Sequence, residues 1–269
     1  MQEPDRKEDK LPGGEIRFRP TLRREREHSR LYKWFDNYWY HHKWKTIICL
    51  FLAVVILVCT FQMCGREKPG DITVLLVGPY GFTEGEAQNN LTRLENCLST
   101  YLPADYDGDG QRRVDALHYT VYSKEQIEQL KTKDPENPIT INTVSNAQEY
   151  QSYNTYTMTG ATSILFLDPW LFEEMAAKGD NGGEYLVEIR TVYGVTAPEG
   201  AVYYTNKKGT ELCLGVRLGD TALYRNNMAL SVLPADTVLC MMVHLATGKT
   251  NAADYQKALD YFAVLAGVS

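Results

Sequence analysis

The sequence predicts an α/β fold, in which a mainly parallel sheet is covered by helices on both faces and is preceded by one transmembrane helix. Two observations support this prediction. Residues 46–65 contain no Asp, Glu, Lys or Arg, and beyond residue 70 short apolar runs alternate with segments of helical periodicity. Strands that alternate with helices are typical of a parallel sheet between two helical layers. With 269 residues, 44% of them hydrophobic, the chain is long enough for one sizeable core.

The charge is divided unevenly along the chain. The residues before Thr46 include 12 Lys and Arg against 8 Asp and Glu, whereas the remainder includes 16 against 26. Proteins that bind nucleic acid need clustered cations to neutralise phosphate groups. The acidic C-terminal part therefore argues against nucleic acid as a partner.

Residues 31–45 are unusually aromatic, with seven Phe, Tyr and Trp side chains. Tyr and Trp rings favour the headgroup layer of a membrane. We therefore predict an amphipathic juxtamembrane helix over 31–45; an unstructured anchor is the alternative. Residues 1–30, which are charged and lack apolar periodicity, are expected to be a disordered cytoplasmic tail. The positions that fall on one helical face are Leu31, Trp34, Phe35, Tyr38, Trp39 and His42.

The uncharged run 46–65 is long enough to cross a membrane, because a helix of this length rises about 30 Å. A buried helix of a soluble protein is the alternative. Basic residues are frequent before the run, but only Arg66 and Lys68 follow it before Arg93. The positive-inside rule then places the N-terminus in the cytoplasm and the C-terminal domain outside the cell. We expect an uncleaved signal-anchor in the cell membrane, because the apolar run is longer than the roughly 7–15 residues usual in a signal peptide; a cleaved signal peptide is the alternative. The lipid bilayer is then a partner, residues 66–70 are a linker and residues 71–269 are the extracytoplasmic domain.

The first elements of the outer domain are predicted from apolar runs and their boundaries. The run ITVLLVG (72–78) is continuous, apolar and followed by Pro, which is typical of a buried strand. Leucines with helical spacing predict a helix over 85–102. A strand over 114–122 follows. Ser123 and Gln126 then form a capping box, which predicts a helix over 123–130.

The later elements begin after a polar segment that extends to Thr159. The run ATSILFLDP (161–169) predicts another buried strand, and WLFEEMAAKG (170–179) predicts a helix that ends at glycine. Residues 201–218 predict a hairpin with its turn at Lys208 and Gly209. Start and stop signals predict two closing helices, over 234–248 and 251–268.

The segment DYDGDGQRRVD is the most specific local motif. Asp105, Asp107 and Asp109 occupy positions 1, 3 and 5 of an EF-hand-type calcium loop, and glycine occupies position 6. Position 12 is Ala116 instead of an acid, so an Asp-Gly turn that leads into the next strand is the alternative. Calcium is the one cofactor for which the sequence offers candidate ligands. These ligands are Asp105, Asp107, Asp109, Gln111 and Asp115.

Two strand ends offer candidate residues for ligand binding. Ligands of α/β sheets bind at the carboxyl ends of strands and at helix N-termini. Tyr80 and Thr83 follow the first predicted strand, whereas Asp168 and Trp170 follow the strand at 161–169. A tight turn between strand and helix, and a helix cap at Asp168, are the alternatives.

Several of these segments also resemble known proteins. YWYHHKWKTIICLFLAVVI looks like the signal-anchor of a family of single-pass membrane proteins of unassigned activity from Clostridia and related Gram-positive bacteria. The runs ITVLLVG, DYDGDGQRRVDALHYTVY, ATSILFLDP and GVRLGDTAL, with the two closing helices, are similar to a reduced type 2 solute-binding-protein lobe. The resemblance implies an extracytoplasmic domain with a single lobe. It implies no particular ligand residue.

Two functions are consistent with the sequence. The first is a non-enzymatic extracytoplasmic domain that binds a solute, a cell-wall component or another membrane protein. It is favoured because the chain contains no GxSxG, HExxH, GxGxxG or GxxxxGK[ST] motif. The alternative is a cell-surface hydrolase that uses Asp168 or the acidic residues of 105–115.

Overall fold

The computed structural model describes residues 30–64, 69–80, 82, 86–133 and 140–268. The chain divides into two compact units, Met1–Glu67 and Lys68–Ser269. Almost all of the predicted tail (1–30), and residues 65–68 around the predicted linker, lie outside the described residues.

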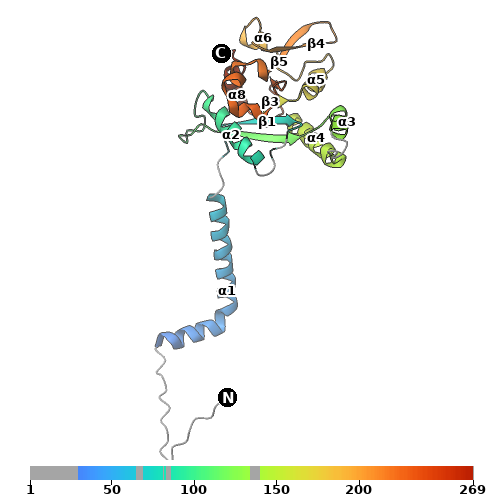
Figure 1. Cartoon of the computed structure of the whole chain (residues 1–269). Helices are drawn as coiled ribbons and strands as arrows, with labels where there is room; N and C mark the ends of the chain where they lie inside the picture. Colours follow the sequence, from blue (N-terminus) through green and yellow to red (C-terminus); the bar gives the residue numbers. More distant parts are fainter. Residues whose placement is uncertain (1–29, 65–68, 81, 83–85, 134–139, 269) are drawn as a thin grey trace, which may run out of the picture. The chain divides into compact units, whose positions relative to one another are not determined.

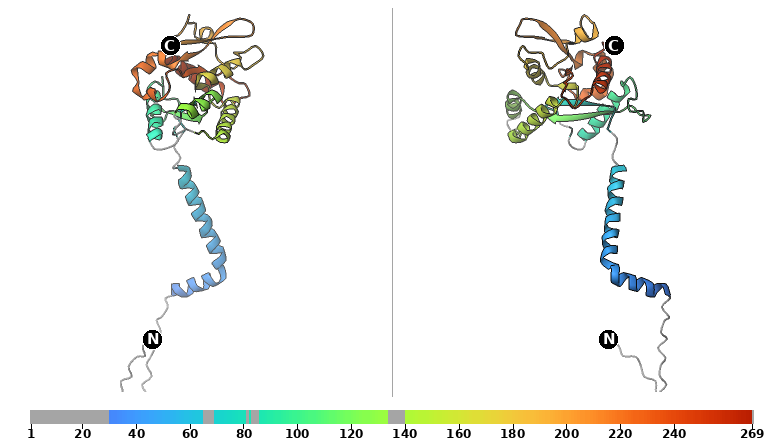
Figure 2. Two further views of the ribbon diagram at one scale, coloured as in Figure 1. Left: turned by 45° about the vertical axis from the view of Figure 1, so that its right-hand side comes forward. Right: turned by 180° about the vertical axis from the view of Figure 1, so that it is seen from behind.

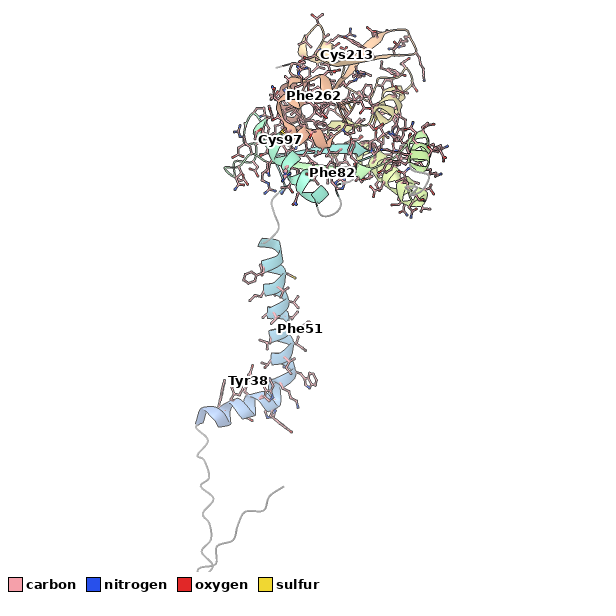
Figure 3. The ribbon with its side chains drawn as sticks, in the orientation of Figure 1. Tyr38, Phe51, Phe82, Cys97, Cys213 and Phe262 are labelled. Carbon is pink, nitrogen blue, oxygen red and sulfur yellow. The ribbon has the colours of Figure 1, made fainter. Side chains whose placement is uncertain are left out.

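The described part of the first unit is the 35-residue helix α1, Arg30–Cys64. This helix includes both the aromatic segment and most of the uncharged run, and its ribbon bends along its length (Figure 1). Tyr38 and Phe51 project from it (Figure 3), and both side chains are exposed within the unit. In the part of the chain that the structure describes, one helix is long and apolar enough to cross a membrane, over Asn37–Phe61.

The second unit contains a six-stranded sheet with the strand order β2-β1-β3-β6-β5-β4. Strand β1 pairs in parallel with β2 and β3, whereas the other three pairings are antiparallel. The predicted α/β class is confirmed, but the sheet is mixed instead of mainly parallel. The strands are β1 (Ile72–Gly78), β2 (Val114–Thr120), β3 (Ile164–Leu167), β4 (Ala201–Thr205), β5 (Glu211–Arg217) and β6 (Val238–Met241).

Strand β6 accounts for much of this difference from the prediction. Its residues lie in the segment 234–248, for which the sequence predicted a helix, and that prediction is wrong. All four residues of β6 are buried, and they pair with β3 on one side and β5 on the other. A short, fully buried apolar run has no periodicity that distinguishes a strand from a helix. Its neighbours in the sheet, β3 and β5, decide its conformation.

Helices cover both faces of the sheet, as predicted (Figure 1, Figure 2). On one face, α2 (Glu86–Thr100) and α8 (Ala252–Ala266) pack over Val74 and Leu76 of β1. On the other face, α4 (Thr143–Met158) and α5 (Pro169–Ala177) pack over Leu75 and Val77. Successive side chains of a strand point to opposite faces, so β1 contributes to both halves of the core.

Local sequence signals explain where several elements begin and end. Helix α3 (Lys124–Lys133) begins at the predicted capping box: Ser123 N donates to Gln126 Oε1 at 2.8 Å, and Gln126 N donates to Ser123 Oγ at 3.1 Å. The predicted hairpin is confirmed, with Gly209 at φ +79° in its turn. The remaining short helices are α6 (Ile189–Tyr193), η1 (Leu218–Asp220), α7 (Ala222–Asn226) and η2 (Met228–Val232).

Helix α4 was not predicted, because its sequence has no apolar periodicity. Its N-terminus is fixed by Asn142, whose side chain accepts hydrogen bonds from Val144 N and Ser145 N. Tyr153 and Thr157 are its buried residues. A helix that buries tyrosine and threonine in place of leucine gives a weak hydrophobic pattern.

Replacing Phe262 with alanine should lower the free energy of unfolding by about 3–5 kcal/mol. The ring is fully buried in the core between α8 and the sheet, so the substitution leaves a cavity. Urea unfolding of the full chain in detergent micelles, followed by circular dichroism, measures the change. Met228→Ala is the control, because Met228 is 90% exposed. Equal midpoints for the two variants would contradict the assignment of Phe262 to the core.

Candidate functional site

The predicted metal loop lies between α2 and β2, beside the start of β1. The carboxylate of Asp105 accepts hydrogen bonds from Gly108 N at 2.8 Å and Gly110 N at 2.7 Å. These bonds lower the pKa of Asp105 below its ordinary value. Both glycines have positive φ, +74° and +87°, a conformation that other residues rarely adopt. The loop is thus held by its own main chain around an ionised carboxylate.

Asp71 joins this loop, although the sequence analysis did not select it. Its Oδ1 accepts hydrogen bonds from Tyr106 N at 2.7 Å and Asp107 N at 3.0 Å. One carboxylate oxygen from each of Asp71, Asp105 and Asp107 lies within 4.8 Å of the others. The parallel register pairs Ile72 with Val114, which places the residue before β1 beside the loop before β2.

The other predicted calcium ligands are not part of this group of three carboxylates. Asp109 Oδ1 accepts a hydrogen bond from Gln111 N at 2.9 Å, within the loop. Asp115 Oδ2 accepts a hydrogen bond from Gly70 N at 2.6 Å, and its Oδ1 lies 3.8 Å from Arg113 Nη2. The structure thus brings Asp105 and Asp107 together with Asp71 and directs Asp115 elsewhere. Three converging carboxylates suit a hard cation such as Ca²⁺, and calcium binding here stays a prediction.

Millimolar CaCl₂ should raise the melting temperature of the full chain if Asp71, Asp105 and Asp107 bind the ion. Extracellular calcium sites dissociate at roughly 10⁻⁴ to 10⁻³ M, and a ligand at a tenfold excess over its dissociation constant stabilises the folded state by about 1.4 kcal/mol. Asp71→Ala and Asp107→Ala should abolish the calcium-dependent shift. Asp220→Ala, which removes an exposed acid elsewhere, should retain it. If the melting temperature responds neither to calcium nor to a chelator, the loop is an Asp-Gly turn without a calcium site.

A second candidate region lies where β1 and β3 end. From β1 the chain continues to α2 on one face of the sheet, whereas from β3 it continues to α5 on the other. Such a change of direction between adjacent parallel strands is the usual position of ligands in α/β folds. Tyr80 and Asp168, both predicted from sequence, lie at this edge. Thr83 lies outside the described residues.

The ring of Tyr80 occupies the space at this edge. Its hydroxyl lies 3.0 Å from Val77 O and 3.1 Å from Phe166 O, so it can donate to either strand. A Cβ atom at position 78 would lie 2.5 Å from the ring, so the close approach requires glycine there. Burial raises the pKa of Tyr80 well above its ordinary value. Tyr80 therefore links β1 and β3 as a neutral phenol.

Asp168 and Trp170 together connect three helices at the same edge. It is the N-cap of α5 and accepts a hydrogen bond from Trp170 N at 3.3 Å. Its other oxygen accepts one from Gln126 Nε2 of α3 at 3.1 Å. Trp170 stacks on Tyr150 of α4, with ring centroids 6.2 Å apart. Burial raises the pKa of Asp168, and the bond from Gln126 opposes this effect. These contacts are structural, and ligand binding by these residues stays a prediction.

The two groups of acids are far apart. The Asp71 group lies before β1, and Asp168 lies beside the opposite end of the same strand, where its N–H donates to Val77 O. Strand β1 has seven residues, a length of about 20 Å. The Asp71 group and Asp168 therefore cannot act on the same bond of a substrate, as a hydrolase that used both would require.

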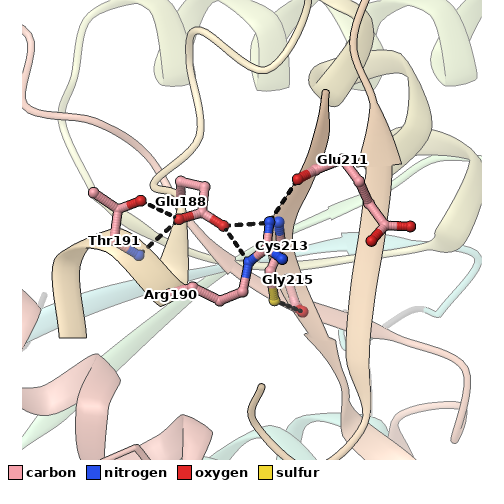
Figure 4. A network of polar contacts seen from close by, with 6 residues as sticks. All are labelled: Glu188, Arg190, Thr191, Glu211, Cys213 and Gly215. Carbon is pink, nitrogen blue, oxygen red and sulfur yellow. Dashed lines mark hydrogen bonds and ion pairs between the residues drawn. The ribbon is translucent and has the colours of Figure 1, made fainter. Parts of the chain in front are cut away.

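Glu188, Arg190 and Cys213 form a third polar network, between α6 and β5 (Figure 4). Glu188 accepts hydrogen bonds from Arg190 Nε at 2.8 Å, from Thr191 N at 2.7 Å and from Cys213 N at 3.1 Å. Burial opposes ionisation of Glu188, but these donors outweigh it and lower its pKa to about 2. Burial, together with the charge of Glu188, raises the pKa of the Cys213 thiol to about 11. A protonated thiol is a poor nucleophile, which argues against a catalytic role for Cys213. The network is structural: Glu188 is the N-cap of α6 and also accepts a hydrogen bond from the main chain of β5.

Two hollows flank helix α4. The sequence analysis predicted neither the helix nor the hollows. The larger, about 620 Å³, lies between α4, Tyr119 of β2 and Lys249, and uncharged polar side chains of α4 line it. The smaller, about 330 Å³, lies between the first half of α4 and the end of β2. Both volumes fall in the range of small-ligand sites, about 300–1,000 Å³. No sequence signal marked them, because they exist only where α4 lies beside β2.

Comparison of the chain with protein-family models, with curated proteins and with solved structures found no match. The resemblance to a reduced solute-binding lobe therefore stays a prediction.

Replacing Glu188 with glutamine should reduce the dependence of stability on pH in acid. The pKa of Glu188 is lower in the folded state than its ordinary value, so its contribution is present above about pH 4.5 and is lost as pH falls towards 2. Glu188→Gln should lower the free energy of unfolding at pH 7 by on the order of 2–3 kcal/mol. It should also lose less stability than the parent between pH 5 and pH 2.5.

Urea unfolding at several pH values measures this difference. Glu199→Gln is the matched control, because Glu199 is in an exposed ion pair with Arg225, and such pairs contribute little. If the Glu188→Gln variant and the parent lose stability in parallel below pH 5, the low pKa assigned to Glu188 is wrong.

Proposed function

We propose that the chain is a single-pass cell-membrane protein whose C-terminal α/β unit lies outside the cell. The observation that carries the proposal is the apolar stretch Asn37–Phe61 of α1, none of which is buried within the structure. A helix that is apolar on all sides is stable when it is buried in protein or lipid. The second unit has a core of its own, and we propose lipid as the environment for this stretch.

The hydroxyl groups within α1 support this environment. Thr46 Oγ1 donates to His42 O at 3.1 Å, and Thr60 Oγ1 donates to Ile56 O at 2.5 Å. Polar groups in a bilayer must find partners within the protein, and these two are satisfied by their own helix. The basic residues that precede the stretch favour a cytoplasmic N-terminus.

We propose that the outer unit binds a ligand and does not catalyse a reaction. Among the described residues, Asp168 caps α5, and Asp105 and Asp107 accept hydrogen bonds from the main chain of the acidic loop. These two groups of carboxylates lie at opposite ends of β1. The Cys213 thiol is buried and protonated at neutral pH. The hollows beside α4 are the concave surfaces on which a solute, a cell-wall component or another membrane protein can bind.

Protease treatment of intact cells tests the topology. An epitope tag fused before Met1 should be protected, whereas a tag after Ser269 should be removed together with the outer unit. Permeabilised cells are the control, because both tags are then accessible. Removal of the N-terminal tag from intact cells would refute the proposed orientation.

A further inference from the structure

The outer edge of strand β2 is only partly hydrogen-bonded. At its start, Val114 N donates to Ser99 Oγ at 2.9 Å and Ala116 N donates to Glu95 Oε1 at 3.0 Å. Both acceptors belong to α2, on the side of β2 away from β1. The main-chain N–H and C=O groups of successive strand residues point to alternate sides. Those of His118 and Thr120 therefore point to the same outer side as those of Val114 and Ala116.

Helix α4 closes the far end of the same edge. Tyr122 N donates to Asn146 Oδ1 at 2.8 Å, and Asn146 Nδ2 donates to Tyr122 O at 3.0 Å. The amide of Asn146 thus pairs with Tyr122 as the main chain of a neighbouring strand would. Between these two closed ends, the main-chain groups of His118 and Thr120 have no hydrogen-bond partner among the residues that the structure describes.

The smaller hollow lies at this open stretch. It has a volume of about 330 Å³. Edge strands are commonly protected by bulges, proline or charged side chains that prevent further pairing, and β2 has none of these at 118–120. The lining includes His118, Thr120 and Tyr122 of the β2 segment, and Asn142, Ser145 and Glu149 of the α4 segment.

Glu149 gives the hollow a negative charge. Its carboxylate makes no ion pair with any cation in the described part of the chain. The nearby side chain of His118 is half-buried and packs edge-on against Phe82, with ring centroids 5.5 Å apart. Burial lowers the pKa of His118, and the charge of Glu149 opposes this effect. A cationic ligand group would complement Glu149.

We propose that the hollow binds an extended peptide that carries a positive charge. The peptide adds as a short strand to the edge of β2, pairs its main chain with His118 and Thr120, and places a lysine side chain at Glu149. Peptides bind in this way to other open sheet edges, where main-chain hydrogen bonds give affinity and neighbouring side chains give specificity. The inference deepens the proposed function, since it names the ligand class of the outer unit.

Binding can be measured with the full chain in nanodiscs and the capped peptide Thr-Lys-Thr-Lys-Thr labelled with a fluorophore. Fluorescence anisotropy should show saturable binding. A peptide with glutamate in place of lysine, and one with N-methylated main chain, should each bind at least tenfold more weakly. Glu149→Gln should weaken binding of the lysine peptide at least fivefold. Equal affinity for the methylated and unmethylated peptides, or no effect of Glu149→Gln, would overturn the proposal.

A pair of variants at position 118 isolates the main-chain contact. His118→Ala removes the imidazole and keeps the N–H group, whereas His118→Pro also removes the N–H group, which points away from β1. Proline is tolerated on edge strands at such positions. We expect His118→Pro to bind at least fivefold more weakly than His118→Ala, and equal binding by two folded variants would overturn the proposal. If the proline variant does not fold, the methylated peptide decides the question.

This experiment is independent of membrane orientation, because both sides of a nanodisc are open to the peptide. A failure to bind would overturn the peptide inference and leave the protease test of the topology unaffected.

Discussion

Strand β1 is the element on which the rest of the structure depends. It pairs in parallel with β2 and β3, and its alternating side chains enter the core on both faces of the sheet. Helices from later in the chain pack on each face because β1 offers apolar side chains in both directions. Two of the polar regions of the unit lie at the ends of this strand, with Asp71 before it and Tyr80 after it. The geometry of either region therefore depends on the register of β1.

Apolar runs and capping residues allowed much of this fold to be predicted. ITVLLVG is continuous and apolar, and it forms the buried strand β1; the Ser123 and Gln126 pair predicted the start of α3 and forms the expected hydrogen bonds. Two elements required tertiary context. The run that became β6 is too short to show a period, and α4 buries tyrosine and threonine, which give little hydrophobic contrast.

The residues at the ends of β1 and β3 were predictable from the strand boundaries, but the acidic group was predictable only where its residues are close in sequence. The spacing of Asp105 and Asp107 marked the acidic loop directly, but Asp71 joins them through the pairing of β1 with β2. The open edge beside α4 was beyond prediction for a different reason. It depends on β2 being the outermost strand of its side of the sheet, and on side chains of α2 and α4 that close its ends but not its centre. An open stretch of a strand edge arises from the way the elements pack together and has no local sequence pattern.

The contact between Gly78 and Tyr80 links the two positions in evolution as well as in space. The tyrosine ring folds back over residue 78 so closely that no Cβ atom can be accommodated there. A side chain at position 78 requires the ring to leave, and its departure would remove the hydroxyl from Val77 O and Phe166 O. A relative with a side chain at position 78 should consequently also have replaced the tyrosine at position 80, whereas glycine at position 78 is compatible with any residue at position 80.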